Sequence, residues 1–148
     1  MGRIWLTVAG LLLAACTGIS EDRTPTMIHA ANVDRLYGRQ FELRSMTIDG
    51  SPVITHVDAR MTLAFLPNGQ AGGFGSVNQF SGTYSFSPEG KLTWGKDGFA
   101  TTRKAGAPEL MDKERQYLAA LRQVTAAVVS KYGLQMENDD GTTKLVFR

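Results

Sequence analysis

The sequence predicts an α+β fold that is mainly β, in which a curved antiparallel sheet, a partly barrel-like meander, carries one amphipathic helix. Two observations support this prediction. From residue 41 onward, short apolar runs alternate with turn residues such as Pro-Asn-Gly at 67–69, which is typical of hairpin-connected strands. Residues 108–123 instead lack Gly and β-branched side chains and repeat apolar residues at helical spacing.

The first element is a predicted lipoprotein signal peptide, residues 1–15. One positive charge, Arg3, precedes an apolar run at 4–13, and small residues ending at Ala15 come directly before Cys16, the only cysteine. A run of this length is shorter than the roughly 20 residues of a membrane-spanning helix, and small residues at its end mark a cleavage site. We therefore expect cleavage between Ala15 and Cys16 and lipidation of the Cys16 thiol.

A lipid thioether at Cys16 defines the expected partner, a membrane, and the expected location. Stable anchoring needs two or more acyl chains, each contributing about 0.8 kcal/mol per buried methylene. Residue 17 is Thr and not the Asp that typically retains lipoproteins at the inner membrane. We therefore expect the protein on the periplasmic face of the outer membrane.

Residues 16–33 are predicted to form the lipidated N terminus and a flexible tether, since the stretch 17–26 is polar and has no apolar period. Residues 34–148 then form one domain. Removing Arg3 with the leader lowers the formal net charge from +2 to +1. So small a net positive charge does not favour nucleic-acid binding. We also expect the protein to be a monomer.

The strands and the helix follow in chain order. Predicted strands before the helix are 41–48, 53–57, 60–66, 82–86, 91–94 and 99–104. The helix begins at Pro108, which suits the first helical position, and Arg122 opposes the negative end of its dipole. Its apolar stripe is Leu110, Met111, Tyr117, Leu118, Leu121 and Val124. Strands at 127–132, 134–137 and 144–147 complete the sheet.

Four motifs in the second half of the chain are distinctive as a set. They are GSVNQFSGTY at 75–84, KLTWG at 91–95, ATTR at 100–103 and ELMDKERQYLAAL at 109–121. Their order and spacing resemble the META domain of HslJ-like heat-shock lipoproteins, over residues 34–148. The resemblance implies an envelope protein linked to heat or antibiotic stress, with a structural or binding role and no established catalytic reaction.

The chain departs from the resembled pattern at three positions. Many members have Cys where this chain has Val77 and again where it has Gly106, and Trp where it has Phe41. The absence of both cysteines is consistent with an oxidising compartment, because a single remaining thiol there would form intermolecular disulfides. The departures place in doubt any function that depends on thiol chemistry.

No catalytic residue, metal site or cofactor is predicted. His29 and His56 have no third ligand at metal spacing, and Ser81 lacks the Gly-x-Ser-x-Gly context of a hydrolase nucleophile. The Gly-rich run at 72–75 lacks the third glycine of a dinucleotide loop. Its favoured interpretation is a bulge or a close backbone approach in the sheet.

Six residues are candidates for recognition. Asn78, Thr102 and Arg103 lie in the resembled motifs, and Glu114 is a charge on the apolar stripe of the helix. A carboxylate at a buried face needs a partner, so Glu114 is expected to pair with Arg103 or with the strand carrying Thr102, as a brace or as part of a recognition cleft. Phe80 and Phe74 lie in or beside a turn-rich segment and are the aromatics expected to be exposed and to bind a peptide, sugar or lipid ring.

Two functions remain open. One is a lipid-anchored protein that interacts with an envelope partner or maintains the envelope, which predicts an exposed apolar or charged patch. The alternative is a periplasmic small-molecule or peptide binding module, which predicts a concave apolar pocket inside the curved sheet.

Overall fold

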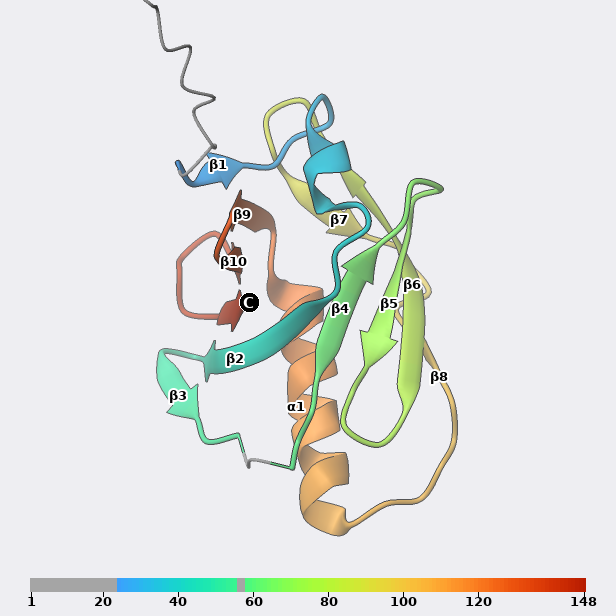
Figure 1. Cartoon of the computed structure of the whole chain (residues 1–148). Helices are drawn as coiled ribbons and strands as arrows, with labels where there is room; N and C mark the ends of the chain where they lie inside the picture. Colours follow the sequence, from blue (N-terminus) through green and yellow to red (C-terminus); the bar gives the residue numbers. More distant parts are fainter. Residues whose placement is uncertain (1–23, 56–57) are drawn as a thin grey trace, which may run out of the picture.

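The computed structural model describes residues 24–55 and 58–148 (Figure 1), so Ala15 and Cys16 lie outside the described residues. These described ranges form one sheet of 11 strands, with one long helix packed against it. The predicted fold class, α+β and mainly β, is confirmed. No helix in the described ranges combines the length and the apolar character needed to cross a bilayer.

The elements follow the order β1 (Thr26–Met27), η1 (Val33–Leu36), β2 (Phe41–Ile48), β3 (Ser51–Val53), β4 (Thr62–Phe65), β5 (Gln70–Phe74), β6 (Gln79–Phe86), β7 (Leu92–Trp94), β8 (Ala100–Thr101), α1 (Pro108–Gln123), β9 (Ala126–Ser130), β10 (Gly133–Glu137) and β11 (Lys144–Phe147). The helix and the strands β2 and β11 have the predicted bounds. The other predicted strands differ at one or both ends, and β1 and β5 were not predicted.

The sheet consists of two antiparallel meanders joined through the C-terminal strand. Its hydrogen-bonded order is β1-β9-β10-β11-β2-β4-β5-β6-β7, with β3 paired to β2 and β8 paired to β6. In the described residues, the end strands β1 and β7 do not pair with each other. Two backbone hydrogen bonds nevertheless connect segments near the two ends of the sheet. One runs from the Ala30 nitrogen to the Ser87 oxygen at 3.1 Å, and the other from the Leu92 nitrogen to the Thr125 oxygen at 2.7 Å. The sheet is therefore strongly curved without closing.

Strand β5 contains the Gly-rich run for which a close backbone approach was predicted. An added Cβ on Gly73 would lie 2.0 Å from the carbonyl oxygen of Thr62, and one on Gly72 would lie 2.7 Å from that of Phe80. Real Cβ atoms do not approach backbone so closely, so the two glycines let neighbouring strands pack at this point. The run is a structural feature of the sheet.

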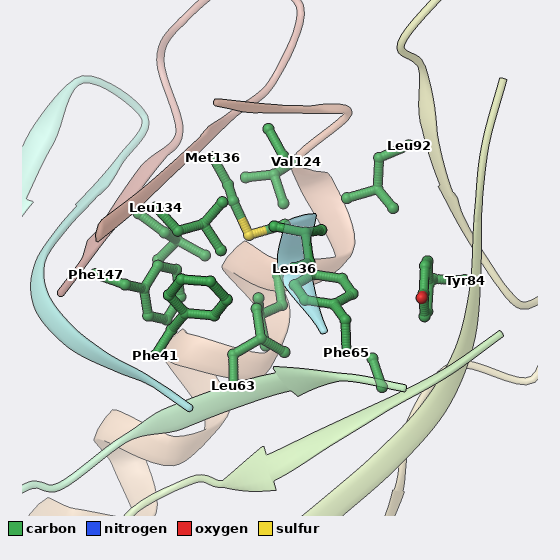
Figure 2. Close-up of a cluster of buried hydrophobic side chains, with 14 of the residues drawn as sticks. Leu36, Phe41, Leu63, Phe65, Tyr84, Leu92, Val124, Leu134, Met136 and Phe147 are labelled. Atoms are coloured by element: carbon green, nitrogen blue, oxygen red, sulfur yellow. The ribbon is translucent and has the colours of Figure 1, made fainter. Parts of the chain in front are cut away.

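The core lies between the concave face of the sheet and α1 (Figure 2), where side chains from both meanders and the helix converge. Tyr117 of α1 is fully buried, and its hydroxyl donates a 3.0 Å hydrogen bond to the carbonyl oxygen of Thr62. Burial raises the pKa of the Tyr117 hydroxyl well above its usual value. Other fully buried side chains include Leu36, Phe41, Leu63, Phe65, Leu121, Leu134 and Met136.

Residues of the predicted tether take part in the fold. Strand β1 pairs with β9, with Thr26 opposite Val129 and Met27 opposite Val128. The side chain of Ile28 is 0% exposed. The packed part of the chain therefore begins before residue 34, because β1 and Ile28 cover the edge and interior of the second meander.

Candidate functional site

The polar candidates gather where the N-terminal half of α1 meets the turn between β5 and β6 and the loop after β8. Glu114 and Asn78 are buried there, with 7% and 4% of their surfaces exposed. Glu114 lies on the buried side of α1, three positions before Tyr117. Because a buried carboxylate is costly without partners, its hydrogen bonds determine what this site can do.

Both carboxylate oxygens of Glu114 accept hydrogen bonds from the β5–β6 turn. Oε2 accepts from the backbone nitrogens of Val77, at 3.0 Å, and Asn78, at 2.6 Å. Oε1 accepts from the Asn78 side-chain nitrogen at 2.8 Å. Hydrogen bonds to a charged acceptor are roughly twice as strong as neutral ones, so this carboxylate fixes the turn against the helix.

Asn78 extends the network to the loop that follows β8. Its side-chain oxygen accepts from the Thr102 hydroxyl at 2.9 Å and from the Lys104 backbone nitrogen at 2.7 Å. The Thr102 hydroxyl also accepts from the backbone nitrogen of Gln79 at 3.1 Å. Asn78 therefore links three segments that are far apart in the sequence.

The turn itself has an unusual conformation. Ser76 has a φ of 98°, which L-residues rarely adopt. Its hydroxyl donates to the carbonyl oxygen of Leu110 at 2.8 Å, and the Gly75 nitrogen donates to the Asn78 carbonyl oxygen at 2.7 Å. Together with Glu114, these bonds hold the strained residue in place.

The structure brings Asn78, Thr102 and Glu114 together but leaves Arg103 outside the network. Arg103 is exposed, and in the described ranges no ion pair joins it to Glu114. The expected Glu114–Arg103 pair is therefore wrong, and the segment carrying Thr102 bonds Asn78 and not Glu114 itself. The carboxylate is satisfied by neutral N–H donors of the nearer turn, which need no second buried charge.

The predicted exposure of Phe80 is also wrong. Strand β6 begins at Gln79 and not at residue 82, so the two-residue period places Phe80 on the same face as Tyr84 and Phe86. Phe80 is 4% exposed and packs edge-on against Phe99 and Tyr117, with ring centroids 5.3 and 5.8 Å apart. It belongs to the core, and almost none of its surface is exposed.

Val77 and Gly106, the two positions at which the resembled pattern often has Cys, lie against each other. A Cβ added to Gly106 would be 3.4 Å from the Cβ of Val77 and 2.7 Å from one of its methyl groups. The pair connects the β5–β6 turn to the loop before α1, next to Asn78. Valine fills the space that a second side chain at residue 106 would otherwise occupy.

The described residues form open hollows around this site. One, of about 290 Å³, is lined by Gln79, Phe80, Ser81, Ala100, Thr101 and Thr102. Inside the curved sheet, core side chains occupy the space (Figure 2), so the concave internal pocket predicted for a binding module is not formed by the described residues. The part of the chain that the structure describes also has no group of three or more His, Cys, Asp or Glu side chains placed to hold a metal ion.

Sequence reasoning missed two parts of this picture. Val77 and Lys104 donate hydrogen bonds to the network from their backbone nitrogens, and the type of side chain at a position does not indicate such a bond. It also missed a cluster of cations at the β1–β9 end of the sheet, Arg35, Arg39 and Lys131, which line one hollow together. Only the pairing of β1 with β9 brings residues so distant in sequence together.

Comparison with known proteins agrees with this architecture. The model of the META domain family matches residues 34–148. A protein from Burkholderia xenovorans, whose structure was solved by NMR, is similar at 26% identity with a TM-score of 0.62, covering 86% of this chain and 92% of its own. No curated protein matches the chain significantly. Since the family match spans most of the sequence and the predicted motifs lie within it, the chain belongs to the META domain family.

Proposed function

We propose that this META domain protein is a non-catalytic, lipid-anchored component of the bacterial envelope, attached to the periplasmic face of the outer membrane through Cys16. Membership of the family supports a non-enzymatic, envelope-associated protein. The observation that carries the anchor is the position of the only cysteine, directly after an apolar leader that ends in Leu-Ala-Ala.

The candidate site supports a structural role for its polar residues. Glu114 and Asn78 direct their hydrogen-bonding atoms at the chain itself, to the turn at Val77 and to the loop at Lys104. A binding cleft instead directs some polar groups toward a ligand. We therefore assign the network to holding helix and sheet together, and infer that the protein acts through its exterior surface on an envelope partner.

The anchor is tested by the mass of the native product. Protein purified from the membrane fraction of its host is expected to begin at Cys16 and to carry the added mass of a diacylglyceryl thioether and an N-terminal acyl group. The Cys16→Ser variant is the matched control, and we expect it to remain unlipidated and to leave the membrane fraction. A native product without added hydrocarbon mass contradicts the anchor.

The location and the role need separate measurements. Density-gradient separation of the two membranes is expected to place the wild-type protein in the outer-membrane fraction, because Thr17 is not an inner-membrane retention signal. We propose a part in maintaining the envelope under heat or antibiotic stress. Crosslinking in intact cells, compared between normal and raised temperature, would identify the partner. Loss of the gene with no change in growth under either stress argues against that role.

A further inference from the structure

Strand β8 has a backbone edge that no other described segment covers. It pairs with β6 alone and lies at the margin of the sheet (Figure 1). The backbone nitrogens of Thr102 and Lys104 both donate toward the start of β6, at 3.0 Å to a carbonyl oxygen and at 2.7 Å to the side chain of Asn78. Since backbone groups alternate in direction along an extended chain, Thr101 and Arg103 direct their N–H and C=O groups away from β6.

The other outer strands of the described sheet have guarded edges. The Leu92 nitrogen of β7 donates across its edge to the Thr125 carbonyl oxygen at 2.7 Å. In β1, the Met27 carbonyl oxygen accepts from the Asn32 side chain at 3.0 Å, and β3 contains Pro52, which has no N–H. Unpaired edges are places where another strand adds, and proteins commonly block them in such ways. Among the described strands, β8 is therefore the edge left open to a partner.

A hollow of about 240 Å³ lies beside this edge, between the start of β8 and the exposed side of α1. It is lined by Phe99, Arg115, Leu118, Ala119 and Arg122. Three of these side chains are apolar and two are guanidinium groups. Because side chains alternate along a strand, every second side chain of a strand added to β8 would lie on the same face as Phe99, next to this hollow.

Cations outnumber acids around the edge. Residues 96–122 contain six cations and four acids. One of the acids, Glu114, is buried and bonded to the β5–β6 turn, and Asp112 is paired with a neighbouring arginine at 2.8 Å. The remaining acids are Asp97 and Glu109. Strands β4, β5 and β6 carry no charged side chain, so they do not offset this positive excess.

Two of the cations lie on the edge itself. Arg103 and Lys104 are exposed, and no ion pair in the described part of the chain involves either of them. A second copy that paired through the same edge would bring these like charges together, which disfavours self-association. An extended segment rich in Asp or Glu would meet opposite charges instead. The charges therefore favour an acidic partner over a second copy.

We propose that the free edge of β8 binds an extended, acidic segment of an envelope protein by strand addition. The segment carries an apolar side chain that packs against Phe99 and Leu118, flanked by Asp or Glu side chains that meet the cations of the edge. Backbone hydrogen bonds to Thr101 and Arg103 give affinity, and the side chains give specificity. This inference rests on the proposed function, since it names the surface through which the protein contacts its envelope partner.

The test selects ligands from a phage-displayed library of random seven-residue peptides. The target is the chain from residue 16 with the change Cys16→Ser, so that neither a membrane nor a thiol takes part. Selected peptides are expected to share an apolar residue flanked by Asp or Glu. A synthetic copy of the most enriched peptide is then titrated against the protein by NMR, and the amide signals of Thr101 and Arg103 should shift most.

Two variants and a control locate the binding edge. Thr101→Pro removes an outward N–H and spares the bonds to β6, so it should weaken peptide binding by about tenfold. Arg103→Glu/Lys104→Glu should weaken it by a similar factor, roughly tenfold. The charge-matched control Lys131→Glu/Arg148→Glu changes exposed cations that follow β9 and β11, and should bind as the unchanged protein does. The urea midpoint of each variant shows whether it is folded.

A change in the peptide keeps the test independent of the folding of any variant. N-methyl groups at every second position remove the N–H donors that face β8 in one register, and those that face solvent in the other. One methylated peptide should therefore lose binding and the other keep it. The proposal is overturned by equal binding of the two methylated peptides, by selected peptides without acidic residues, by the largest NMR shifts lying outside residues 99–104, or by a control as weak as Arg103→Glu/Lys104→Glu.

These measurements are separate from the test of the anchor. A native protein without lipid would refute the anchor and leave peptide binding to β8 measurable. Failure of the peptides to bind would remove the partner edge and leave the lipid at Cys16 and the membrane location unchanged.

Discussion

Replacing Glu114 by alanine is expected to lower the free energy of unfolding by about 3 to 5 kcal/mol. The change removes the acceptor for the backbone nitrogens of Val77 and Asn78 and for the Asn78 side chain, and leaves these donors buried without a partner. It also releases the strained turn at Ser76. Urea unfolding followed by fluorescence of Trp94 would measure the difference.

Two further variants separate the brace from a general effect on the helix. Glu114→Gln keeps the shape but turns an N–H group toward N–H donors, so we expect a loss of about 2 kcal/mol. Glu109→Gln, in the exposed first turn of the same helix, is the control and should change stability by less than about 0.5 kcal/mol. An unchanged midpoint for Glu114→Gln would remove the brace assigned to this carboxylate.

The second large effect is a gain in stability from the double variant Val77→Cys/Gly106→Cys. The separation of 3.4 Å between the Val77 Cβ and an added Cβ on Gly106 is close to the spacing found across disulfides. The bridge would close a loop of about 30 residues, for which loop-closure entropy gives about 3.5 kcal/mol. We expect the oxidised form to unfold at a correspondingly higher denaturant concentration than the reduced form.

The comparison between oxidised and reduced protein isolates the effect of the bridge. Both are measured in a Cys16→Ser background, which prevents pairing with the native thiol, and the single variants Val77→Cys and Gly106→Cys report the cost of altered packing. Two free thiols after oxidation, or coincident unfolding curves for the two redox forms, would contradict the predicted geometry.

The sequence predicted correctly those elements whose own residues show a clear apolar pattern. The helix at Pro108–Gln123 has an uninterrupted helical stripe, and β2 and β11 have clear apolar runs. Strand β5 was not predicted because its glycines carry no apolar alternation. Strand β1 was not predicted because two residues have no period, and its position is set only by the distant strand β9.

The candidate site was predicted in part for the same reason. Glu114 was identified because a charge interrupts an apolar stripe, and Asn78 because it lies in a motif of the resembled family. Their hydrogen-bond partners were not identified. A sequence shows a possible ionic partner such as Arg103, but it does not show which backbone nitrogens will lie beside a carboxylate. Phe80 was misjudged because the start of β6 was placed three residues too late, which hid the alternation that buries it.

The central place of β11 in the sheet has a consequence for how the chain matures. This strand is the last of the described strands to be synthesised, yet it alone joins β2 to β10. Its end is fixed by reciprocal backbone bonds between Glu42 and Arg148, of 2.9 and 3.0 Å. Until residues 144–148 leave the ribosome, no strand joins β2 to β10, so we expect the two meanders to pair along this edge only at the end of synthesis.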